Sequence, residues 1–167
     1  MEDVSNPGLL PAGLSDLLPP DAGFEASVTE RLIDSCQAQG YQRVKPPLME
    51  FEDSLLSGTG AAMDRQVFRL MDPVSQRMMG LRADITPQIA RIAESRLKSS
   101  PRPLRLCYAG QVLRVRGDQI RPERQFAQIG AELIGSTAPA AECGVATSCV
   151  PPGSASIPSC AAPYRAA

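Results

Sequence analysis

The sequence predicts an α+β domain in which an antiparallel sheet is flanked by helices. Along residues 1–135, stretches with helical spacing of apolar residues alternate with stretches that have the two-residue period of strands. Short turns join several of the candidate strands, which is typical of antiparallel hairpins. With 167 residues, the chain is long enough for one domain with a buried core.

The first expected element is a helix from Asp21 to about Gln39. Asp21 is a suitable N-cap because its carboxylate can accept a hydrogen bond from a backbone N–H of the first turn. Gly40 is a natural stop for the helix. The apolar stripe expected to face the core consists of Phe24, Val28, Leu32 and Cys36.

An extended segment and a hairpin are expected next. Residues 41–51 (YQRVKPPLMEF) are predicted to form a short strand or extended stretch. Pro46 and Pro47 confine it to an edge or an irregular region, because proline cannot donate to a sheet ladder. Residues 65–82 are predicted to form a hairpin that turns at Asp72–Pro73.

A second helix and two strands complete the predicted domain. Thr86 is the expected N-cap of a helix over residues 86–97, with Pro87 at the first helical position. Its buried stripe is expected to comprise Ile89, Ile92, Ala93 and Leu97. Residues 104–116 and 124–135 then form two strands, which a polar loop over residues 117–123 connects.

The composition excludes several classes of function. Lys and Arg number 17 against 18 Asp and Glu, and this balance argues against a dedicated nucleic-acid binder. No apolar run of about 18 residues is present, so no membrane span is expected. The acidic N-terminus is unlike a signal peptide, which favours a cytoplasmic protein.

The reactive side chains also narrow the possible chemistry. The sequence has no His, which removes the commonest general base and metal ligand. Its cysteines form no C-x-x-C pair, and we expect free thiols and no metal site. The five cysteines are Cys36, Cys107, Cys143, Cys149 and Cys160.

The last part of the chain differs in character from the rest. Residues 136–167 have no Leu and no periodicity, and are rich in Pro, Ser, Ala and Gly. Such a segment buries too little apolar surface to offset its ordering entropy, so we expect a disordered tail. The abrupt change also suggests a second hypothesis, in which the authentic reading frame is lost near Ser136.

The last strand has two unlike faces. One is apolar and suits a core; it carries Ala127, Ile129, Ala131 and Leu133. The other carries Arg124, Phe126, Gln128, Gly130 and Glu132. Gly130 leaves room above the strand for a ligand, and Gln128 and Glu132 are suited to hydrogen-bond a small polar molecule. The alternative, which the pattern leaves equally open, is a solvated face.

Two further clusters admit a functional or an ordinary structural interpretation. Arg114 and Arg116 share a face of the preceding strand and Arg124 follows them, an arrangement that suits phosphate or carboxylate recognition. The alternative is ordinary surface arginine. In LRADITP, Arg82, Asp84 and Thr86 alternate along a strand that leads into a helix. A carboxylate and a hydroxyl so spaced suit an ammonium group, or simply a helix cap.

Taken in order, these clusters resemble the catalytic core of class II aminoacyl-tRNA synthetases, and in particular the histidyl-tRNA synthetase branch. Residues 40–55 (GYQRVKPPLMEFEDSL) look like motif 1, and residues 102–135 look like motif 2 with the strand after it. LRADITPQIAR is similar to the synthetase stretch L-R-P-E-x-T-x-x-x-x-R. The resemblance covers about residues 9–135, the N-terminal part of such a core, which would be incomplete at the C-terminus.

The resemblance implies roles for individual residues. Asp84 and Thr86 match residues that hold the amino group of histidine, and Gln128 and Glu132 match residues that contact the same amino acid. Arg114 matches the motif 2 arginine that binds the α-phosphate of ATP. The motif 1 proline, here Pro47, lies at the dimer interface in that family.

The sequence also departs from the synthetases. Arg116 stands where motif 2 has a glutamate that helps to hold ATP, and Ala127 replaces a histidine. Motif 3, the histidine-specific motif and the anticodon-binding domain have no counterpart in these 167 residues. The resemblance therefore implies that the chain does not activate histidine, and no catalytic residue or cofactor is expected.

A non-synthetase branch of this family, the regulatory subunits of ATP phosphoribosyltransferase, is more similar to these motifs. Membership would imply a hetero-oligomer with a short-form catalytic subunit, which catalyses the first step of L-histidine biosynthesis. It would also imply self-association as a dimer and feedback regulation by histidine as effector. The alternatives are a histidyl-tRNA synthetase fragment and an interaction paralogue whose pocket no longer binds a ligand.

Overall fold

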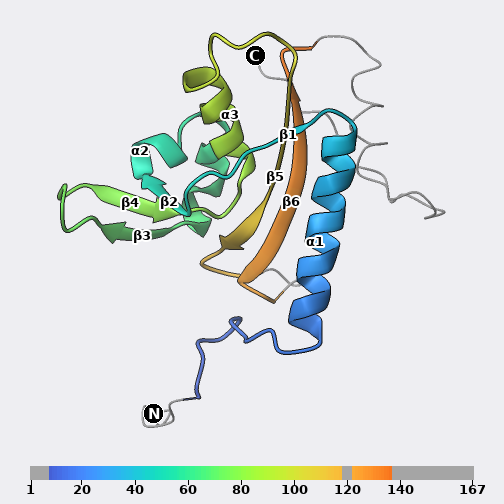
Figure 1. The fold of residues 1–167 in the computed structure, drawn as a ribbon. Helices are drawn as coiled ribbons and strands as arrows, with labels where there is room; N and C mark the ends of the chain where they lie inside the picture. The colour runs from blue at the N-terminus through green and yellow to red at the C-terminus, as the bar shows by residue number, and fades with distance from the viewer. Residues whose placement is uncertain (1–7, 118–121, 137–167) are drawn as a thin grey trace.

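The computed structural model describes residues 8–117 and 122–136, with the side chain of Thr59 left out (Figure 1). Strands and helices alternate along this part of the chain. In order, the elements are α1 (Asp21–Ala38), β1 (Gln42–Arg43), β2 (Met49–Phe51), α2 (Glu52–Leu55), the 3₁₀ helix η1 (Gly58–Gln66), β3 (Phe68–Met71), β4 (Met78–Leu81), α3 (Thr86–Ser95), β5 (Leu104–Leu113) and β6 (Gln125–Ile134).

The described strands form two three-stranded sheets, in the orders β1-β5-β6 and β2-β4-β3. β5 and β6 are the longest strands and pair antiparallel from Leu104↔Ile134 to Leu113↔Gln125. β1 pairs with β5 in parallel, a pairing that the sequence pattern did not predict. The predicted α+β class is confirmed.

Helix α1 covers one face of β5 and β6 (Figure 1). Its buried residues are Ile33 and Cys36, which pack against Tyr41 and Cys107. The predicted stripe was wrong at its first position, because the side chain of Phe24 is 72% exposed. Cys36, the last member of the predicted stripe, is buried as expected, and Ile33, which the stripe did not include, is buried with it, whereas Val28 and Leu32 are half-buried.

The two ends of α1 had different outcomes. Asp21 is the first helical residue and not the N-cap, which is Pro20, and no side chain caps the first turn. The predicted stop at Gly40 is confirmed. Gly40 has a φ of +82°, and its N–H donates to Gln37 O while the Tyr41 N–H donates to Cys36 O. This is the Schellman arrangement, which glycine adopts without steric cost.

Helix α3 lies on the opposite side of β5 and β6 from α1 (Figure 1). Its buried residues include Ile89 and Ala93, as the stripe predicted, whereas Ile92 and Leu97 are half-buried. Ile89 and Ala93 pack with Ile85 and the inward side chains of β5 in one core cluster, and Leu97 packs against it.

The prediction of Thr86 as the N-cap of α3 was wrong: the N-cap is Ile85, and Thr86 is the first helical residue. Its N–H donates to Asp84 Oδ1 at 2.9 Å. The Asp84 carboxylate therefore accepts a hydrogen bond from the first N–H group of the helix. The Thr86 hydroxyl contacts the Tyr108 hydroxyl on β5 instead of capping the helix.

The predicted hairpin is confirmed as β3 and β4, which turn at Asp72–Pro73. The Asp72 carboxylate accepts hydrogen bonds from the N–H groups of Val74 and Ser75 and from the Ser75 hydroxyl. These bonds lower the pKa of Asp72. Such an aspartate fixes the turn by replacing backbone partners.

The described helices include none long and apolar enough to cross a membrane. The predicted tail, residues 136–167, lies outside the described residues from position 137 onward, together with Cys143, Cys149 and Cys160. Cys36 and Cys107 are both buried under α1.

Candidate functional site

Two of the predicted ligand-binding residues, Asp84 and Gln128, are in direct contact. Gln128 Nε2 donates to Asp84 Oδ1 at 2.8 Å, and Gln128 Oε1 accepts the Ile85 N–H at 2.9 Å. The amide orientation follows from this pattern of one donor and one acceptor. The contact joins β6 to the stretch before α3, two regions 44 residues apart in the sequence.

The other two predicted residues, Thr86 and Glu132, meet through a tyrosine. Thr86 Oγ1 and the Tyr108 hydroxyl are 2.9 Å apart, and the Tyr108 hydroxyl donates to Glu132 Oε1 at 3.3 Å. The four predicted side chains therefore gather on one face of the β5–β6 pair, beside the N-terminus of α3. Polar groups collected in this way between a sheet and a helix suit a small polar ligand.

The space that the sequence assigned to a ligand above Gly130 is filled by Tyr108. The two residues are register partners, and a Cβ on Gly130 would lie 2.4 Å from the tyrosine hydroxyl oxygen. The glycine thus accommodates the aromatic ring of the neighbouring strand. A ligand that contacts Glu132 must approach beside Tyr108 and not directly over Gly130.

Burial controls the ionisation of Glu132 and Tyr108. The pKa of Glu132 is raised, mainly by burial; its hydrogen-bond partners Tyr108 and Thr86 lower it, and the charge of Asp84 raises it further. Burial also raises the pKa of Tyr108, which stays a hydroxyl donor at neutral pH. Because the charge of Asp84 acts on Glu132, a cation bound beside these two carboxylates would offset their mutual repulsion.

Arg82, which shares the alternation of Asp84 and Thr86 in LRADITP, makes its side-chain hydrogen bonds outside this cluster. The residue is 7% exposed, and its guanidinium donates to the carbonyl oxygens of Gln111 at 2.8 Å and Pro46 at 3.0 Å. Burial lowers the pKa of Arg82. Asp84 and Thr86, the other members of the predicted trio, remain at the cluster.

The three candidate anion-binding arginines lie in different surroundings. Arg114 Nε donates to Ala83 O at 3.4 Å and its guanidinium lies over the Phe126 ring. The backbone N–H of Arg116 donates to Gln66 Oε1 at 3.3 Å. Through Ala83 O, Arg114 is joined to the residue next to Asp84.

The donors of Arg124 are used inside the protein. Its Nε donates to Arg114 O at 3.2 Å and its Nη1 to Ala12 O at 3.0 Å. Gly13 fits against it, since a Cβ there would lie 2.9 Å from the arginine Cδ. Arg124 therefore fastens the N-terminal segment to the start of β6 and would have to release carbonyls to bind an anion.

Pro47, the candidate interface residue, is exposed, and so is Leu48 beside it. The backbone carbonyl oxygen of Pro47 accepts a hydrogen bond from Gln88 Nε2 at 2.9 Å. Gln88 also donates to Glu50, whose buried carboxylate pairs with Arg91.

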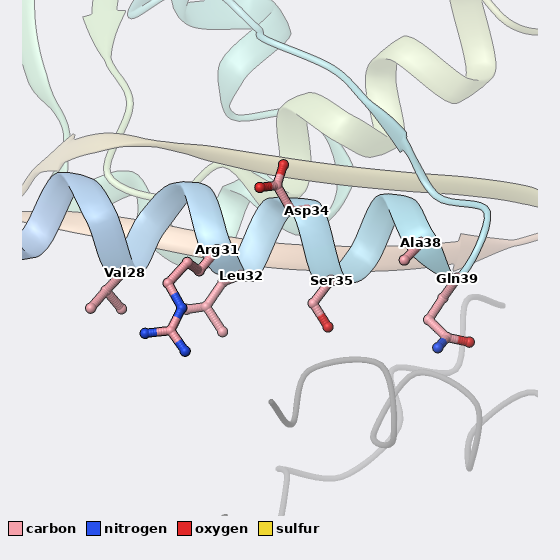
Figure 2. Close-up of a pocket in the computed structure, with 7 residues that line it drawn as sticks. All are labelled: Val28, Arg31, Leu32, Asp34, Ser35, Ala38 and Gln39. Atoms are coloured by element: carbon pink, nitrogen blue, oxygen red, sulfur yellow. The ribbon is translucent and has the colours of Figure 1, made fainter. Parts of the chain in front are cut away.

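A hollow lies elsewhere, along α1 (Figure 2). Its described lining comes from this one helix: Val28, Arg31, Leu32, Asp34, Ser35, Ala38 and Gln39. None of the predicted site residues contributes to it. Within the described ranges, no group of three or more potential metal ligands gathers.

A comparison with protein families identifies this architecture. The family model for histidyl-tRNA synthetase matches residues 13–148 of the 167. The chain belongs to the histidyl-tRNA synthetase family. The fold is accordingly that of the class II aminoacyl-tRNA synthetases, as the motifs of the sequence predicted.

Members of the histidyl-tRNA synthetase family that carry a regulatory name are highly similar to the chain. A protein of Paramagnetospirillum magneticum named "ATP phosphoribosyltransferase regulatory subunit" is 66% identical over 136 residues, which cover 81% of this chain and 36% of the relative. A protein of Rhodospirillum centenum with the same name is 67% identical over 127 residues, 76% of this chain and 33% of the relative. The chain thus spans about a third of the length of the curated relatives it matches.

Solved structures of the histidyl-tRNA synthetase family agree with the fold. The crystal structure of an ATP phosphoribosyltransferase regulatory subunit/histidyl-tRNA synthetase from Bacillus halodurans matches with a TM-score of 0.67 at 31% identity. The match covers 80% of this chain and 34% of that chain.

Sequence reasoning about this family member missed Tyr108, the residue that joins two of the predicted ligand-binding side chains. The available signal was an aromatic residue on one long strand and a glycine on the next, a pair that fits when the two are opposite. The register that makes Tyr108 and Gly130 partners depends on the intervening loop, whose geometry the pattern does not specify.

Proposed function

We propose that the chain corresponds to about a third of a non-catalytic regulatory subunit required for ATP phosphoribosyltransferase activity, the first step of L-histidine biosynthesis. The observation that carries this proposal is the 64–67% identity to three relatives with that name. Arg116 supports it, because an arginine in place of the synthetase glutamate reverses the charge where ATP would be held. Catalysis would then belong to the partner subunit.

The cluster around Asp84 and Glu132 is proposed as the effector site, with histidine as the ligand. Asp84 and Glu132 supply negative charge for the ammonium group, while Gln128 and the Thr86 and Tyr108 hydroxyls supply directional hydrogen bonds. Arg114, whose terminal nitrogens donate to none of the described residues, is suited to the carboxylate or another anion. Histidine can regulate only if it binds two states of the assembly with different affinity.

The partners proposed for the chain follow from the same family. They are a short-form catalytic subunit in a hetero-oligomer and a second copy of the regulatory subunit, with Pro47 at the contact between copies. The exposed side chains of Pro47 and Leu48 support this contact, since apolar groups at an exposed turn gain from being covered. A cytoplasmic location is proposed with them.

The proposal is tested by the phosphoribosyltransferase activity of the matching catalytic subunit, measured with and without the chain while histidine is titrated. We expect activation, and histidine inhibition that Glu132→Ala weakens. A matched control is Glu94→Ala, which removes an exposed carboxylate on α3. Activity that is identical with and without the chain, and again with a full-length regulatory subunit of the same sequence family, would overturn the regulatory assignment.

The alternative function, that of a histidyl-tRNA synthetase fragment, has a separate readout. Histidine-dependent exchange of pyrophosphate into ATP requires amino-acid activation, which a regulatory subunit does not perform. Exchange above the background of a chain with Arg114→Ala would favour the synthetase.

A further inference from the structure

Arg82 occupies the junction between the two sheets. Its backbone N–H donates to Leu48 O at 3.1 Å, and its carbonyl oxygen accepts from the Leu113 N–H at 3.1 Å. Its guanidinium adds bonds to Gln111 O, Pro46 O and, at 3.4 Å, Pro47 O. Arg82, the residue that follows β4, is thus hydrogen-bonded both to β5 and to the segment between β1 and β2.

The positive charge of Arg82 is held by carbonyl dipoles. It forms no ion pair with any residue in the described ranges. The fold makes room for the guanidinium at Gly110, where a Cβ would lie 2.4 Å from Arg82 Nη2. A buried arginine with this many fixed acceptors has one available position, because each lost bond would leave a desolvated donor.

The Pro46–Pro47 segment depends on these side chains for its position. Two consecutive prolines have no backbone N–H, so the backbone of the segment can form hydrogen bonds only through its carbonyl oxygens. Arg82 Nη1 donates to Pro46 O and Gln88 Nε2 donates to Pro47 O. Gln88 is 1% exposed and donates also to Glu50 Oε1, which anchors the second clamp in the core.

Both clamps belong to the stretch that supplies the proposed effector site. Arg82 precedes Asp84 by two residues, and Gln88 follows Thr86 by two. Asp84 is bonded to Gln128 and Thr86 to Tyr108. The first and last residues of the stretch 82–88 therefore hold the proline segment, and the residues between them belong to the proposed site.

We propose that Arg82 is a positioning residue that couples the Pro46–Pro47 segment to the cluster of Asp84, Thr86, Gln128 and Glu132. A change on either side is transmitted through the fixed guanidinium, and the coupling is reciprocal because it is a free energy shared by two sites. The role of the cluster as a histidine site rests on the proposed function. The mechanical link between the two regions does not.

The test uses a fluorescent reporter on the proline segment. The sequence has no Trp, so Leu48→Trp places a single tryptophan at a position that is 47% exposed. Into this chain we introduce Gln128→Leu, which breaks the bonds to Asp84 and to the Ile85 N–H. We expect the emission of the tryptophan to shift, although the side-chain hydrogen bonds of Gln128 are made to Asp84 and Ile85 and not to the segment.

The same change is then made with Arg82→Lys, which keeps the charge and loses the fork of donors. We expect the emission shift to fall about fivefold or more, and the affinity for L-histidine, measured by calorimetry, to fall by a similar factor. The matched control is Arg77→Lys, an exposed arginine on the hairpin that pairs with Asp53. It should leave the shift unchanged.

A second variant guards against a loss of folding in Arg82→Lys. Gln88→Met keeps the buried volume and removes the donor to Pro47 O, so the shift should decrease with both sheets intact. A shift of equal size with and without Arg82, or no shift from Gln128→Leu in the parent chain, would overturn the coupling. If calorimetry detects no binding of L-histidine while the tryptophan emission shifts as expected, only the effector proposal is contradicted.

Discussion

The two faces of the β5–β6 pair show how the same strands serve packing and chemistry. On the side of α1, Ile129 and Ala131 pack against the apolar cluster of Ile33 and Cys107. On the side of α3, the intervening positions carry Gln128 and Glu132, which join a hydrogen-bonded network. Because side chains alternate along a strand, a single register positions both faces. The apolar face fixes the geometry that the polar face uses.

The largest expected effect is on the apolar face. Ile33 is completely buried, so Ile33→Ala removes methyl groups that nothing replaces and should cost about 2–5 kcal/mol of unfolding free energy. Denaturant unfolding measures this. Val28→Ala on the same helix, at a half-buried position, is the control and should cost clearly less. Equal losses would contradict the assignment of the α1 face.

On the polar face, the fit of Tyr108 against Gly130 gives the next prediction. Gly130→Ala brings a Cβ to 2.4 Å from the tyrosine Cζ and should cost about 1–3 kcal/mol through overpacking. Gly23→Ala is the matched control, since a Cβ at this helical position meets nothing within 4 Å. That control should stabilise the chain by about 0.5–1 kcal/mol. A neutral Gly130→Ala would show that Tyr108 moves freely away from β6.

The hydroxyl of Thr86 tests the network more gently. Thr86→Val is nearly isosteric and removes the 2.9 Å contact with the Tyr108 hydroxyl. The tyrosine keeps Glu132 as an acceptor, so the cost should be about 0.5–1.5 kcal/mol. Thermal unfolding followed by circular dichroism measures it. A Thr86→Val chain as stable as the parent would mean that the hydroxyl pair is not formed in solution.

The smallest effect is the pH dependence contributed by Glu132. Burial raises the pKa of the folded carboxyl above its ordinary value of 4.5, so the folded state binds the proton more tightly than the unfolded state. The stabilisation is complete below pH 4.5 and is lost as the pH rises through the folded pKa. As the pH rises from 4.5 through the folded pKa, the denaturant midpoint of Glu132→Gln should therefore increase relative to that of the parent chain. Parallel curves would contradict it.

Sequence alone predicted the elements that periodicity specifies. Both long strands, the hairpin at Asp72–Pro73 and the stop of α1 at Gly40 follow from local rules of alternation, turn chemistry and backbone conformation. The burial of α1 was predicted less well, because Phe24 is exposed whereas Ile33, which the predicted stripe did not include, is completely buried. Which side of a weakly amphipathic helix is covered is decided by its partners.

At the site, alternation placed Gln128 and Glu132 on one face and the spacing of Asp84 and Thr86 indicated a polar pair. How these two pairs meet depends on long-range packing, in which the Tyr108 hydroxyl connects Thr86 to Glu132. Arg82 shows the same limit from the other direction. It shares the alternation of the polar residues, yet the crossing of two sheets buries it among carbonyl groups.

Calorimetric titration of the chain with L-histidine tests the central claim, that the polar face of β5 and β6 is an amino-acid site. Asp84→Asn removes the charge nearest to Gln128, and Asp34→Asn removes an exposed carboxylate on α1 as a control. The account predicts saturable binding to the parent chain and to Asp34→Asn, with affinity reduced about tenfold or more in Asp84→Asn. Equal affinity in all three chains, or no binding to the parent, would contradict it.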